Sequence, residues 1–217
     1  ESEYVCAHYR VREYMSGFTG SAGTLVVTLQ EAGLWTDGRY FLQAEQQLAG
    51  TGIRLFRMGE PGVPKLPEYV KEKLTGGKLG FDGRVMGAFC AETLFQAARE
   101  SGAQVLVTED LAGAIWENRP GIPDTRLFLL DERYTGEGTE QKLAGIREEL
   151  RRAGAKIHVL ASLCDIAWIL NLRGGDIPCV PVVLSFLCIT ETDCIWYVRN
   201  RIVTEEIRRE LEGKGIR

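Results

Sequence analysis

The sequence predicts an α/β protein built from two consecutive domains. β-rich runs alternate with segments of helical periodicity along all 217 residues, which is typical of α/β domains. The stretch 118–123 (NRPGIP) holds two prolines and a glycine and separates two such patterns, as interdomain linkers do. The length also suits two domains of ordinary size. We therefore expect one domain over residues 1–120 and a second over residues 121–217.

In the first half, a β hairpin is followed by helices and strands in alternation. Phe41, Ala44 and Leu48 recur at helical spacing, and Thr36 or Asp37 lies near the expected N-cap of their helix. Thr108 is expected to cap a last short helix that ends at Trp116. The other predicted elements are strands 24–29, 33–36, 53–57, 79–82 and 105–107, and helices 39–49, 67–74 and 91–101.

The second half repeats this alternation. Leu143, Ile146 and Leu150 define a helix that ends at Gly154. Ser162 and Asp165 form the pattern of a capping box at the start of a helix over 163–171. Strands are predicted at 127–130 and 157–160, a hairpin at 182–190 and 194–198, and a final helix capped by Thr204.

Composition and charge exclude two classes of partner. The net charge is −4, and neither half has the basic face that binding to a phosphate backbone requires, so we expect no nucleic-acid partner. The longest apolar runs are too short to span a bilayer, so we expect no membrane association. The even count of six cysteines could indicate disulfides, but the chain is not a small disulfide-stabilised domain, and no Cys-x-x-Cys pair supports a structural zinc site. We therefore expect buried, reduced thiols in a cytoplasmic protein.

The densest glycine cluster lies at residues 16–23 (SGFTGSAG). A phosphate-binding loop would be followed by a lysine and a helix, whereas this cluster is followed by a strand. We therefore interpret it as a tight path of the backbone, for which glycine is suited.

The first candidate site is the corner between a strand and a helix at residues 35–40. Asp37 is either a helix cap or a catalytic acid. Arg39 carries a cation near the positive end of a helix dipole, which is unfavourable unless a carboxylate compensates it. That carboxylate is either Asp37 or a glutamate of the same domain, or it belongs to a substrate or a catalytic domain.

The second candidate site is the segment 171–177 (NLRGGDI). Asn171 and the two glycines after it are typical of a helix C-cap, and Arg173 and Asp176 are placed to pair with each other. The chain has only two histidines, His8 and His158, and neither has the neighbours that a nucleophile or a two-metal site requires. We therefore predict no catalytic residue and no metal ligand in this segment.

Several strings resemble one family when taken together. These are residues 3–5 (EYV), 16–23 (SGFTGSAG), 34–45 (LWTDGRYFLQAE), 115–120 (IWENRP) and 165–177 (DIAWILNLRGGDI), the last followed by Pro181 and Val182. In this order, and over nearly the whole chain, they resemble the N-terminal domains of Xaa-Pro aminopeptidases of the creatinase and prolidase superfamily.

This resemblance implies two consecutive creatinase-N-terminal-like domains, each a mixed sheet flanked by helices, in an enzyme of the three-domain form. It implies that the first domain lacks its first strand and helix and that the second is incomplete at its C-terminus. In such enzymes a third domain holds two divalent metal ions, usually manganese, on two aspartates, a histidine and two glutamates, and releases an N-terminal residue that precedes proline. None of those ligand positions lies in this segment.

The resemblance also implies which surfaces face substrate. The N-terminal domains of the family wall the substrate cleft and contribute to the active site of a neighbouring subunit. The implied partners are the chain's own C-terminal catalytic domain, a peptide substrate and a second subunit of a homodimer. The substrate-facing candidates are Trp35, Asp37, Arg39, Tyr40, Asn171, Arg173 and Asp176.

Two other hypotheses remain open at this stage. The chain could be a stand-alone binding or regulatory module derived from the family. The coding sequence downstream of Arg217 would discriminate this module from a piece of a longer peptidase. An α/β hydrolase or a nucleotide-binding protein is the third, but the sequence contains neither a Gly-x-Ser-x-Gly nor a Walker pattern.

Overall fold

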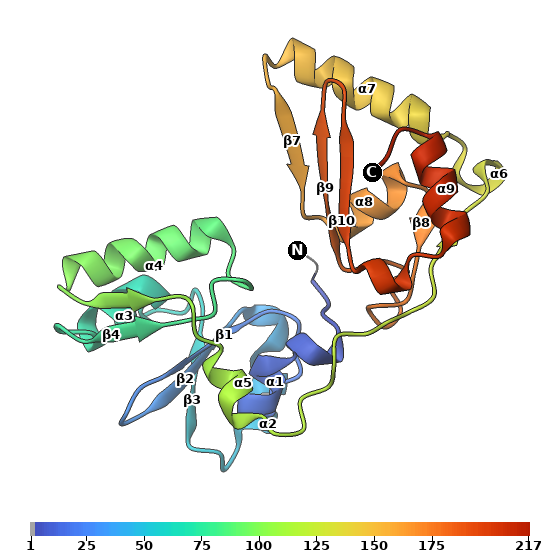
Figure 1. Ribbon diagram of the computed structural model, residues 1–217. Coiled ribbons are helices and arrows are strands. Elements are labelled where there is room, and N and C mark those ends of the chain that lie inside the picture. The colour runs from blue at the N-terminus through green and yellow to red at the C-terminus, as the bar shows by residue number, and fades with distance from the viewer. Residues whose placement is uncertain (1–2) are drawn as a thin grey trace. The chain divides into compact units, whose positions relative to one another are not determined.

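A computed structural model describes residues 3–217 of the chain (Figure 1). The chain divides into two compact units. The N-terminal unit comprises Tyr9–Pro120, and the C-terminal unit comprises Gly121–Arg217 together with the segment before Tyr9. Both units combine small sheets with flanking helices, so the predicted α/β class is confirmed.

The N-terminal unit contains two sheets. In the first, β2 (Ala32–Thr36) lies between β1 (Thr24–Val27), which is antiparallel to it, and β3 (Ile53–Arg57), which is parallel to it. The crossover to the parallel strand is made by η2 (Gly38–Tyr40) and α2 (Phe41–Leu48), and Phe18, Leu34, Ala44 and Leu48 form the core beneath it. The second sheet pairs β4 (Lys78–Gly80) in parallel with β5 (Gln104–Leu106). The remaining helices of this unit are α1 (Val11–Ser16), α3 (Leu66–Lys73), α4 (Ala88–Glu100) and α5 (Leu111–Ile115), and η1 (Ala7–Tyr9) lies at the boundary of the two units.

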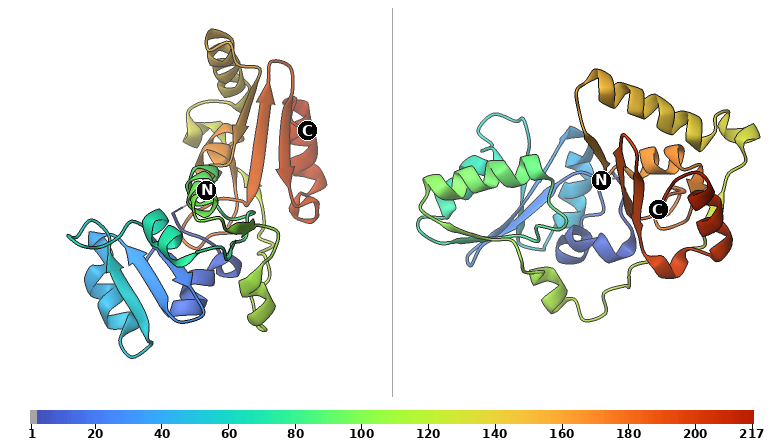
Figure 2. Two further views of the ribbon diagram at one scale, coloured as in Figure 1. Left: turned by 90° about the vertical axis from the view of Figure 1, so that its left-hand side faces the viewer. Right: turned by 45° about the horizontal axis from the view of Figure 1, so that its top comes forward.

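The C-terminal unit is built on the sheet β10-β9-β7, in which both pairs are antiparallel. Its strands are β7 (Ile157–Leu160), β9 (Ser185–Thr190) and β10 (Cys194–Val198), and β9 and β10 lie side by side in both views of Figure 2. A two-stranded sheet pairs β6 (Phe128–Leu129) with β8 (Leu172–Arg173). The helices are α6 (Glu132–Thr135), α7 (Thr139–Arg152), α8 (Leu163–Ile169) and α9 (Glu205–Gly213), and η3 (Asn200–Ile202) precedes the last of them.

The two faces of the sheet β10-β9-β7 differ in burial. Leu160, Leu187, Ile189 and Trp196 form one core with apolar residues of α7, α8 and α9. Side chains alternate between the two faces of a strand. The opposite face therefore carries Ile157, Val159, Phe186 and Tyr197, all of which are exposed. We refer to these four residues as the open face.

Several local predictions are wrong in detail. The helix expected after Thr108 begins after Asp110, whose carboxylate accepts a hydrogen bond from the Gly113 amide over 2.8 Å. Ser162 precedes α8, but its side chain makes no capping hydrogen bond. The strand expected over 182–190 begins only at Ser185, and the elements α1, α6 and β8 were not predicted.

Candidate functional site

Trp35 supports the 35–40 corner from inside the N-terminal unit. Its side chain is only 1% exposed. The ring stacks on Phe56 at 3.9 Å between centroids and meets Tyr69 edge-on, while Nε1 donates to the Pro64 carbonyl over 3.0 Å. These contacts explain why a tryptophan stands near the end of β2, because its side chain packs against Phe56 of β3 and Tyr69 of α3.

Asp37 and Arg39 form a fork on the surface of the corner. Asp37 is the N-cap of η2, where its Oδ1 accepts from the backbone N–H of Arg39 over 3.1 Å. The guanidinium returns to the same carboxylate, with Nε–Oδ1 and Nη2–Oδ2 distances of 2.9 Å each. Arg39 lowers the pKa of the Asp37 carboxyl through these hydrogen bonds. The carboxylate that Arg39 requires is therefore supplied within its own turn.

Tyr40 completes the corner next to the glycine cluster. Its hydroxyl is 2.6 Å from the Ser21 hydroxyl, and its ring meets Phe18 edge-on. A Cβ at Gly20 would lie 2.3 Å from the Phe18 ring and 2.8 Å from the Tyr40 ring. The glycine cluster therefore serves close packing against these two aromatic rings, in agreement with its interpretation as a tight backbone path.

Asn171 occupies a buried turn directly after α8 in the C-terminal unit. It adopts a left-handed conformation with φ of 49°, which asparagine tolerates better than most residues. Neither Gly174 nor Gly175 has a positive φ, so the prediction that the glycines form the helix cap is wrong. Gly174 is needed for packing instead, because a Cβ there would lie 2.4 Å from the Val183 side chain.

A buried lysine holds this turn. The Nζ of Lys142 donates to the Asn171 Oδ1 over 2.6 Å and to the Trp168 carbonyl over 2.7 Å, and it lies 4.4 Å from the centroid of the Trp168 ring. Asn171 in turn donates from Nδ2 to the Glu137 carbonyl over 2.9 Å. Burial lowers the pKa of Lys142, because removal from water disfavours its charged form. Lys142 was not singled out from the sequence, because nothing near it in the chain marks it as buried.

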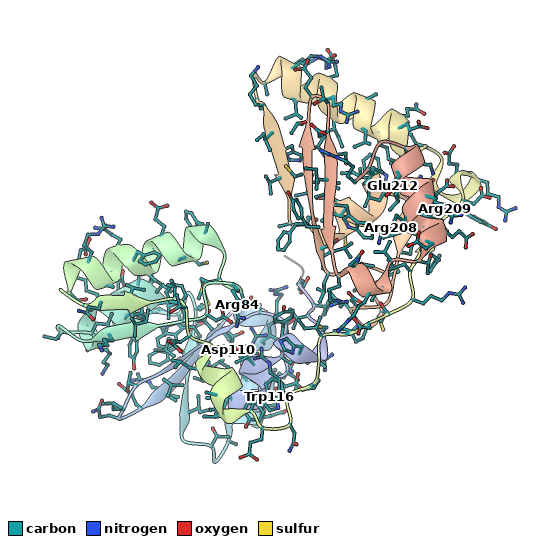
Figure 3. The ribbon with its side chains drawn as sticks, in the orientation of Figure 1. Arg84, Asp110, Trp116, Arg208, Arg209 and Glu212 are labelled. Atoms are coloured by element: carbon teal, nitrogen blue, oxygen red, sulfur yellow. The ribbon has the colours of Figure 1, made fainter. Side chains whose placement is uncertain are left out.

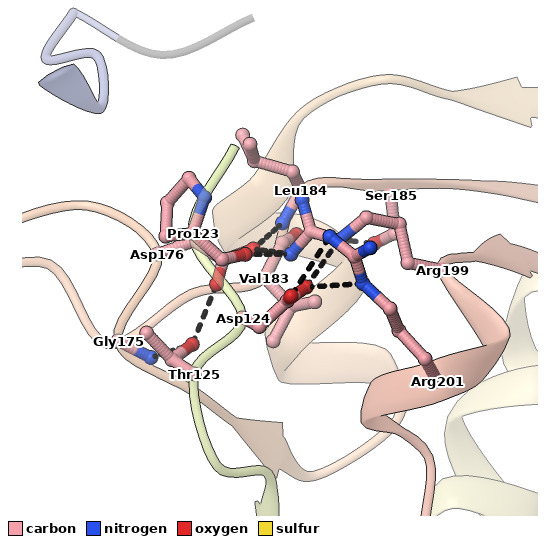
Figure 4. A network of polar contacts seen from close by, with 10 residues as sticks. All are labelled: Pro123, Asp124, Thr125, Gly175, Asp176, Val183, Leu184, Ser185, Arg199 and Arg201. Carbon is pink, nitrogen blue, oxygen red and sulfur yellow. Dashed lines mark hydrogen bonds and ion pairs between the residues drawn. The ribbon is translucent and has the colours of Figure 1, made fainter. Parts of the chain in front are cut away.

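Asp176 is the centre of a buried polar network (Figure 4). Its carboxylate accepts from the Thr125 hydroxyl over 2.5 Å, from the Leu184 amide over 2.9 Å and from Arg199 Nη2 over 3.0 Å. Arg199 also donates to the Pro123 carbonyl and pairs with Asp124, which Arg201 contacts at 2.7 Å. The network joins the start of the unit, the loop after β8 and the segment after β10.

Arg173 does not pair with Asp176, so that predicted ion pair is wrong. Its Nη1 donates to the carbonyls of Ala167 and Leu172 over 2.6 and 3.0 Å. Ala167 lies in the last turn of α8, where unpaired carbonyls favour a cation. The ion-pair partner of Asp176 is Arg199, which lies 23 residues further along the chain. No local sequence pattern predicts this pair.

A second cluster of aspartate–arginine ion pairs, more exposed than the network around Asp176, lies near the end of the N-terminal unit. Asp110 pairs with Arg119 at 2.5 Å and with Arg84 at 3.3 Å, and Arg84 forks onto Asp82. Trp116 lies beside this cluster and stacks on Tyr14 at 4.4 Å between centroids (Figure 3). Hydrogen bonds from the Gly113 amide and then from Arg119 lower the pKa of Asp110.

The described residues assemble no metal site. Among residues 3–217, no three histidine, cysteine, aspartate or glutamate side chains are grouped so that they could hold a metal ion. All six cysteines are free thiols, but Cys90, Cys164 and Cys179 are exposed, so the expectation of burial is wrong for these three. No helix in this part of the chain is both long and apolar enough to cross a membrane.

The fold defines a class of protein with two α/β units in tandem, each with small sheets and flanking helices. Residues 4–118 match a family model described as the creatinase/prolidase N-terminal domain, and residues 118–217 match a second model with the same description. The chain therefore belongs to the creatinase/prolidase N-terminal domain family, and the resemblance drawn from the sequence is confirmed.

Relatives of known name cover the whole chain. It is 40% identical to Aminopeptidase P2 of Arabidopsis thaliana and 39% identical to a probable Xaa-Pro aminopeptidase P of Sordaria macrospora, over 100% and 99% of this chain. A crystal structure of X-prolyl aminopeptidase from Caenorhabditis elegans, described as a cytosolic enzyme with a di-nuclear active site, superposes with a TM-score of 0.92 at 30% identity over 99% of this chain. The chain spans 31%, 35% and 35% of the lengths of these three proteins, about a third of each.

Proposed function

We propose that this chain is the N-terminal, non-catalytic part of a metal-dependent Xaa-Pro aminopeptidase, which removes the N-terminal residue from peptides with proline in second position. One observation carries the proposal: the chain matches aminopeptidase P proteins from end to end, while it spans only about a third of their length. Proteins of the same family share a fold more reliably than an activity, so the activity needs its own test.

The metal chemistry of this proposal belongs to the catalytic domain. A two-metal centre activates water and stabilises charge in the transition state of hydrolysis. It requires several carboxylates and a histidine that converge, and residues 3–217 bring no such group together. We assign two divalent ions, in our proposal manganese, to the catalytic domain, and no ligand of theirs to this chain.

The proposed task of this chain is to wall the substrate cleft and to support assembly. Its partners would be the catalytic domain, the peptide and a second subunit of a cytoplasmic homodimer. The 35–40 corner offers the exposed Arg39 for this purpose, whereas Trp35 is buried beneath it. In the loop 171–176, Asn171 and Asp176 are both buried and bonded, so their contribution would be to hold the loop in shape.

The test compares the longer natural gene product with the 217-residue chain. Both are incubated with a peptide that has proline second, with and without manganese, and the released N-terminal residue is measured. We expect manganese-dependent release by the longer protein only. The matched control is the same peptide with alanine in place of proline, which should be cleaved far more slowly.

Two results would contradict the proposal. Release by the 217-residue chain, surviving removal of trace contaminants, would show that it carries its own catalytic centre. A reading frame that ends at Arg217 would identify the chain as a stand-alone binding or regulatory module.

A further inference from the structure

A groove lies between α3 and α4 on the surface of the N-terminal unit. The two helices pack against each other through Val70, Leu94 and Ala97. A cavity of about 540 Å³ adjoins this contact, and Ala97 belongs to both. We call this cavity the α3–α4 groove. Its lining includes Glu68 and Lys71 of α3 and Phe89, Glu92, Ala97 and Glu100 of α4.

The groove carries more negative than positive charge. Three carboxylates line it, whereas Lys71 is the one cation among its described lining residues. Lys71 Nζ donates to one oxygen of Glu100 over 2.8 Å, and Gln96 Nε2 donates to the other oxygen over 2.8 Å. Hydrogen bonds from Lys71 and then from Gln96 lower the pKa of Glu100. The charges of Glu100 and Lys71 therefore compensate each other within the chain.

The other two carboxylates lack a counter-ion. Glu68 is the third residue of α3, and its Oε2 accepts from the backbone N–H of Lys65 over 3.0 Å. This hydrogen bond caps the helix, but an amide donor brings no positive charge. The Glu92 side chain has no ion-pair partner among residues 3–217. The α3–α4 groove therefore has a surplus of two negative charges, from Glu68 and Glu92.

An exposed aromatic ring lies beside one of these carboxylates. Phe89 is 84% exposed although its side chain is apolar. It precedes Glu92 by three residues in α4, so the two side chains share one face of the helix. An arginine guanidinium stacks on aromatic rings and pairs with a carboxylate through two hydrogen bonds. An aromatic ring next to a carboxylate therefore suits arginine better than lysine, whose ammonium group has no plane to stack.

Other classes of ligand fit the groove less well. Its carboxylates do not converge, since no three acidic, histidine or cysteine side chains of residues 3–217 are grouped to hold a metal ion. Phosphate backbones and anionic lipid headgroups would be repelled by the negative charge. A neutral peptide would desolvate the two carboxylates without compensating them. A polypeptide with two cationic side chains meets these requirements, because its charges are spread along a chain.

We propose that the α3–α4 groove is a docking site for a segment of another protein that carries two arginines. One guanidinium stacks on Phe89 and pairs with Glu92, and the other pairs with Glu68. The two positive charges equal the surplus of the groove, and arginine is among the residues that dominate the binding energy of protein interfaces. The inference goes beyond the proposed function and does not depend on it, because it concerns the N-terminal unit alone.

The test is an NMR titration of the isotope-labelled 217-residue chain with the capped peptide acetyl-Leu-Arg-Ala-Arg-Ala-amide. Its arginines are two residues apart and so lie on one face of an extended peptide. We expect saturable shifts centred on the backbone amides of Glu68, Phe89 and Glu92. The control peptide has citrulline, a neutral analogue of arginine, at both positions and should bind at least about tenfold more weakly. Added salt should weaken binding of the arginine peptide.

Four variants locate the binding on the groove. Glu92→Gln, Glu68→Gln and Phe89→Ala should each weaken the arginine peptide by about fivefold, as expected for partly exposed contacts. Glu68→Gln removes the charge and keeps an oxygen for the cap of α3. Glu72→Gln is the matched control, because Glu72 is an exposed acid of α3 that does not line the groove. The Tm of each variant should stay close to the parent value, so that weaker binding is not a sign of unfolding.

Three results would overturn the proposal. The first is binding of the citrulline peptide as tightly as the arginine peptide. The second is unchanged affinity in Glu92→Gln and Glu68→Gln, or shifts that map to another surface of the chain. The third is a set of shifts at the groove that appears when the chain is concentrated without peptide, which would identify a second copy of the chain as the occupant.

Discussion

The chain contains two aspartate–arginine pairs of the same chemistry in opposite surroundings. Asp37 and Arg39 are two residues apart, and their side chains are 38% and 63% exposed. Asp176 and Arg199 are 23 residues apart, and their side chains are 0% and 21% exposed. The first pair belongs to a single turn, whereas the second joins three segments of its unit.

This difference in burial determines how much stability is lost when each ion pair is broken. Water screens the exposed pair, so its loss costs little. The buried carboxylate has lost its hydration and depends on the protein for every hydrogen bond. It receives three, from Thr125, Leu184 and Arg199. Removing one member of a buried ion pair leaves the charge of the other member uncompensated, which is strongly destabilising.

The substitution Asp176→Asn is the strongest test of whether the buried ion pair contributes more to stability than the exposed one. The amide oxygen can take the place of Oδ2 and accept from Leu184 and Arg199, with Nδ2 facing the Thr125 hydroxyl, but the Arg199 guanidinium loses the negative charge of its buried partner. We expect the free energy of unfolding of the C-terminal unit to fall by about 3 kcal/mol, measured by urea denaturation. Asp37→Asn is the matched control and should leave the urea midpoint nearly unchanged. Similar shifts for both variants would show that burial does not distinguish the pairs.

Lys142→Met tests a buried cation in the same unit. It removes the donor to Asn171 Oδ1 and to the Trp168 carbonyl. We expect a loss of about 2 kcal/mol, because Asn171 Oδ1 is left unpaired and the Trp168 carbonyl keeps only its backbone donors. Lys71→Met, at an exposed lysine paired with Glu100, is the control and should have little effect. A Lys142 variant as stable as the parent chain would contradict the bonding described.

The contribution of Lys142 to folding stability should increase with pH. Because burial lowers the pKa of Lys142 in the folded state, the unfolded state binds more protons between that lowered pKa and the ordinary lysine value of 10.5. Stability therefore gains a contribution from Lys142 as the pH rises through this window. The difference in urea midpoint between the parent chain and Lys142→Met should widen there. A constant difference would mean that the pKa is not lowered.

Asp110→Ala tests the more exposed cluster of the N-terminal unit. It removes the cap of α5 and an ion-pair partner of Arg119, and we expect a loss of about 1 kcal/mol. Since the pKa of Asp110 is lowered in the folded state, this contribution is present above the ordinary aspartate value of 3.8 and is lost as the pH falls through the folded pKa. The parent chain and the variant should therefore converge in stability in strong acid.

Arg39→Ala should have the smallest effect. The guanidinium of Arg39 is already paired with Asp37, so in the longer enzyme that we propose we expect Tm and kcat/KM to stay close to the parent values. A loss of kcat/KM of about tenfold or more at constant Tm would instead identify a substrate contact. Arg57→Ala, at another exposed ion pair of this unit, controls for the loss of a surface charge.

Sequence reasoning was most accurate where the partners are near in the chain. The periodicity of α2 and α7 and the caps Asp37 and Thr204 follow from neighbours within four residues. It failed for Asp176, because Arg173 is the nearest cation in the chain whereas Arg199 is the one that the fold brings into contact. Lys142 was missed for the same reason, since its acceptors lie in another helix and the turn after it.

The open face of the sheet β10-β9-β7 has a consequence for the chain in solution. Ile157, Val159, Phe186 and Tyr197 form an apolar surface without charges among them, and contiguous surfaces of this kind promote aggregation. The net charge of −4 opposes this through repulsion between molecules, but salt screens that repulsion. The 217-residue chain should therefore scatter more light as ionic strength and protein concentration rise, and Val159→Lys should restore its colloidal stability.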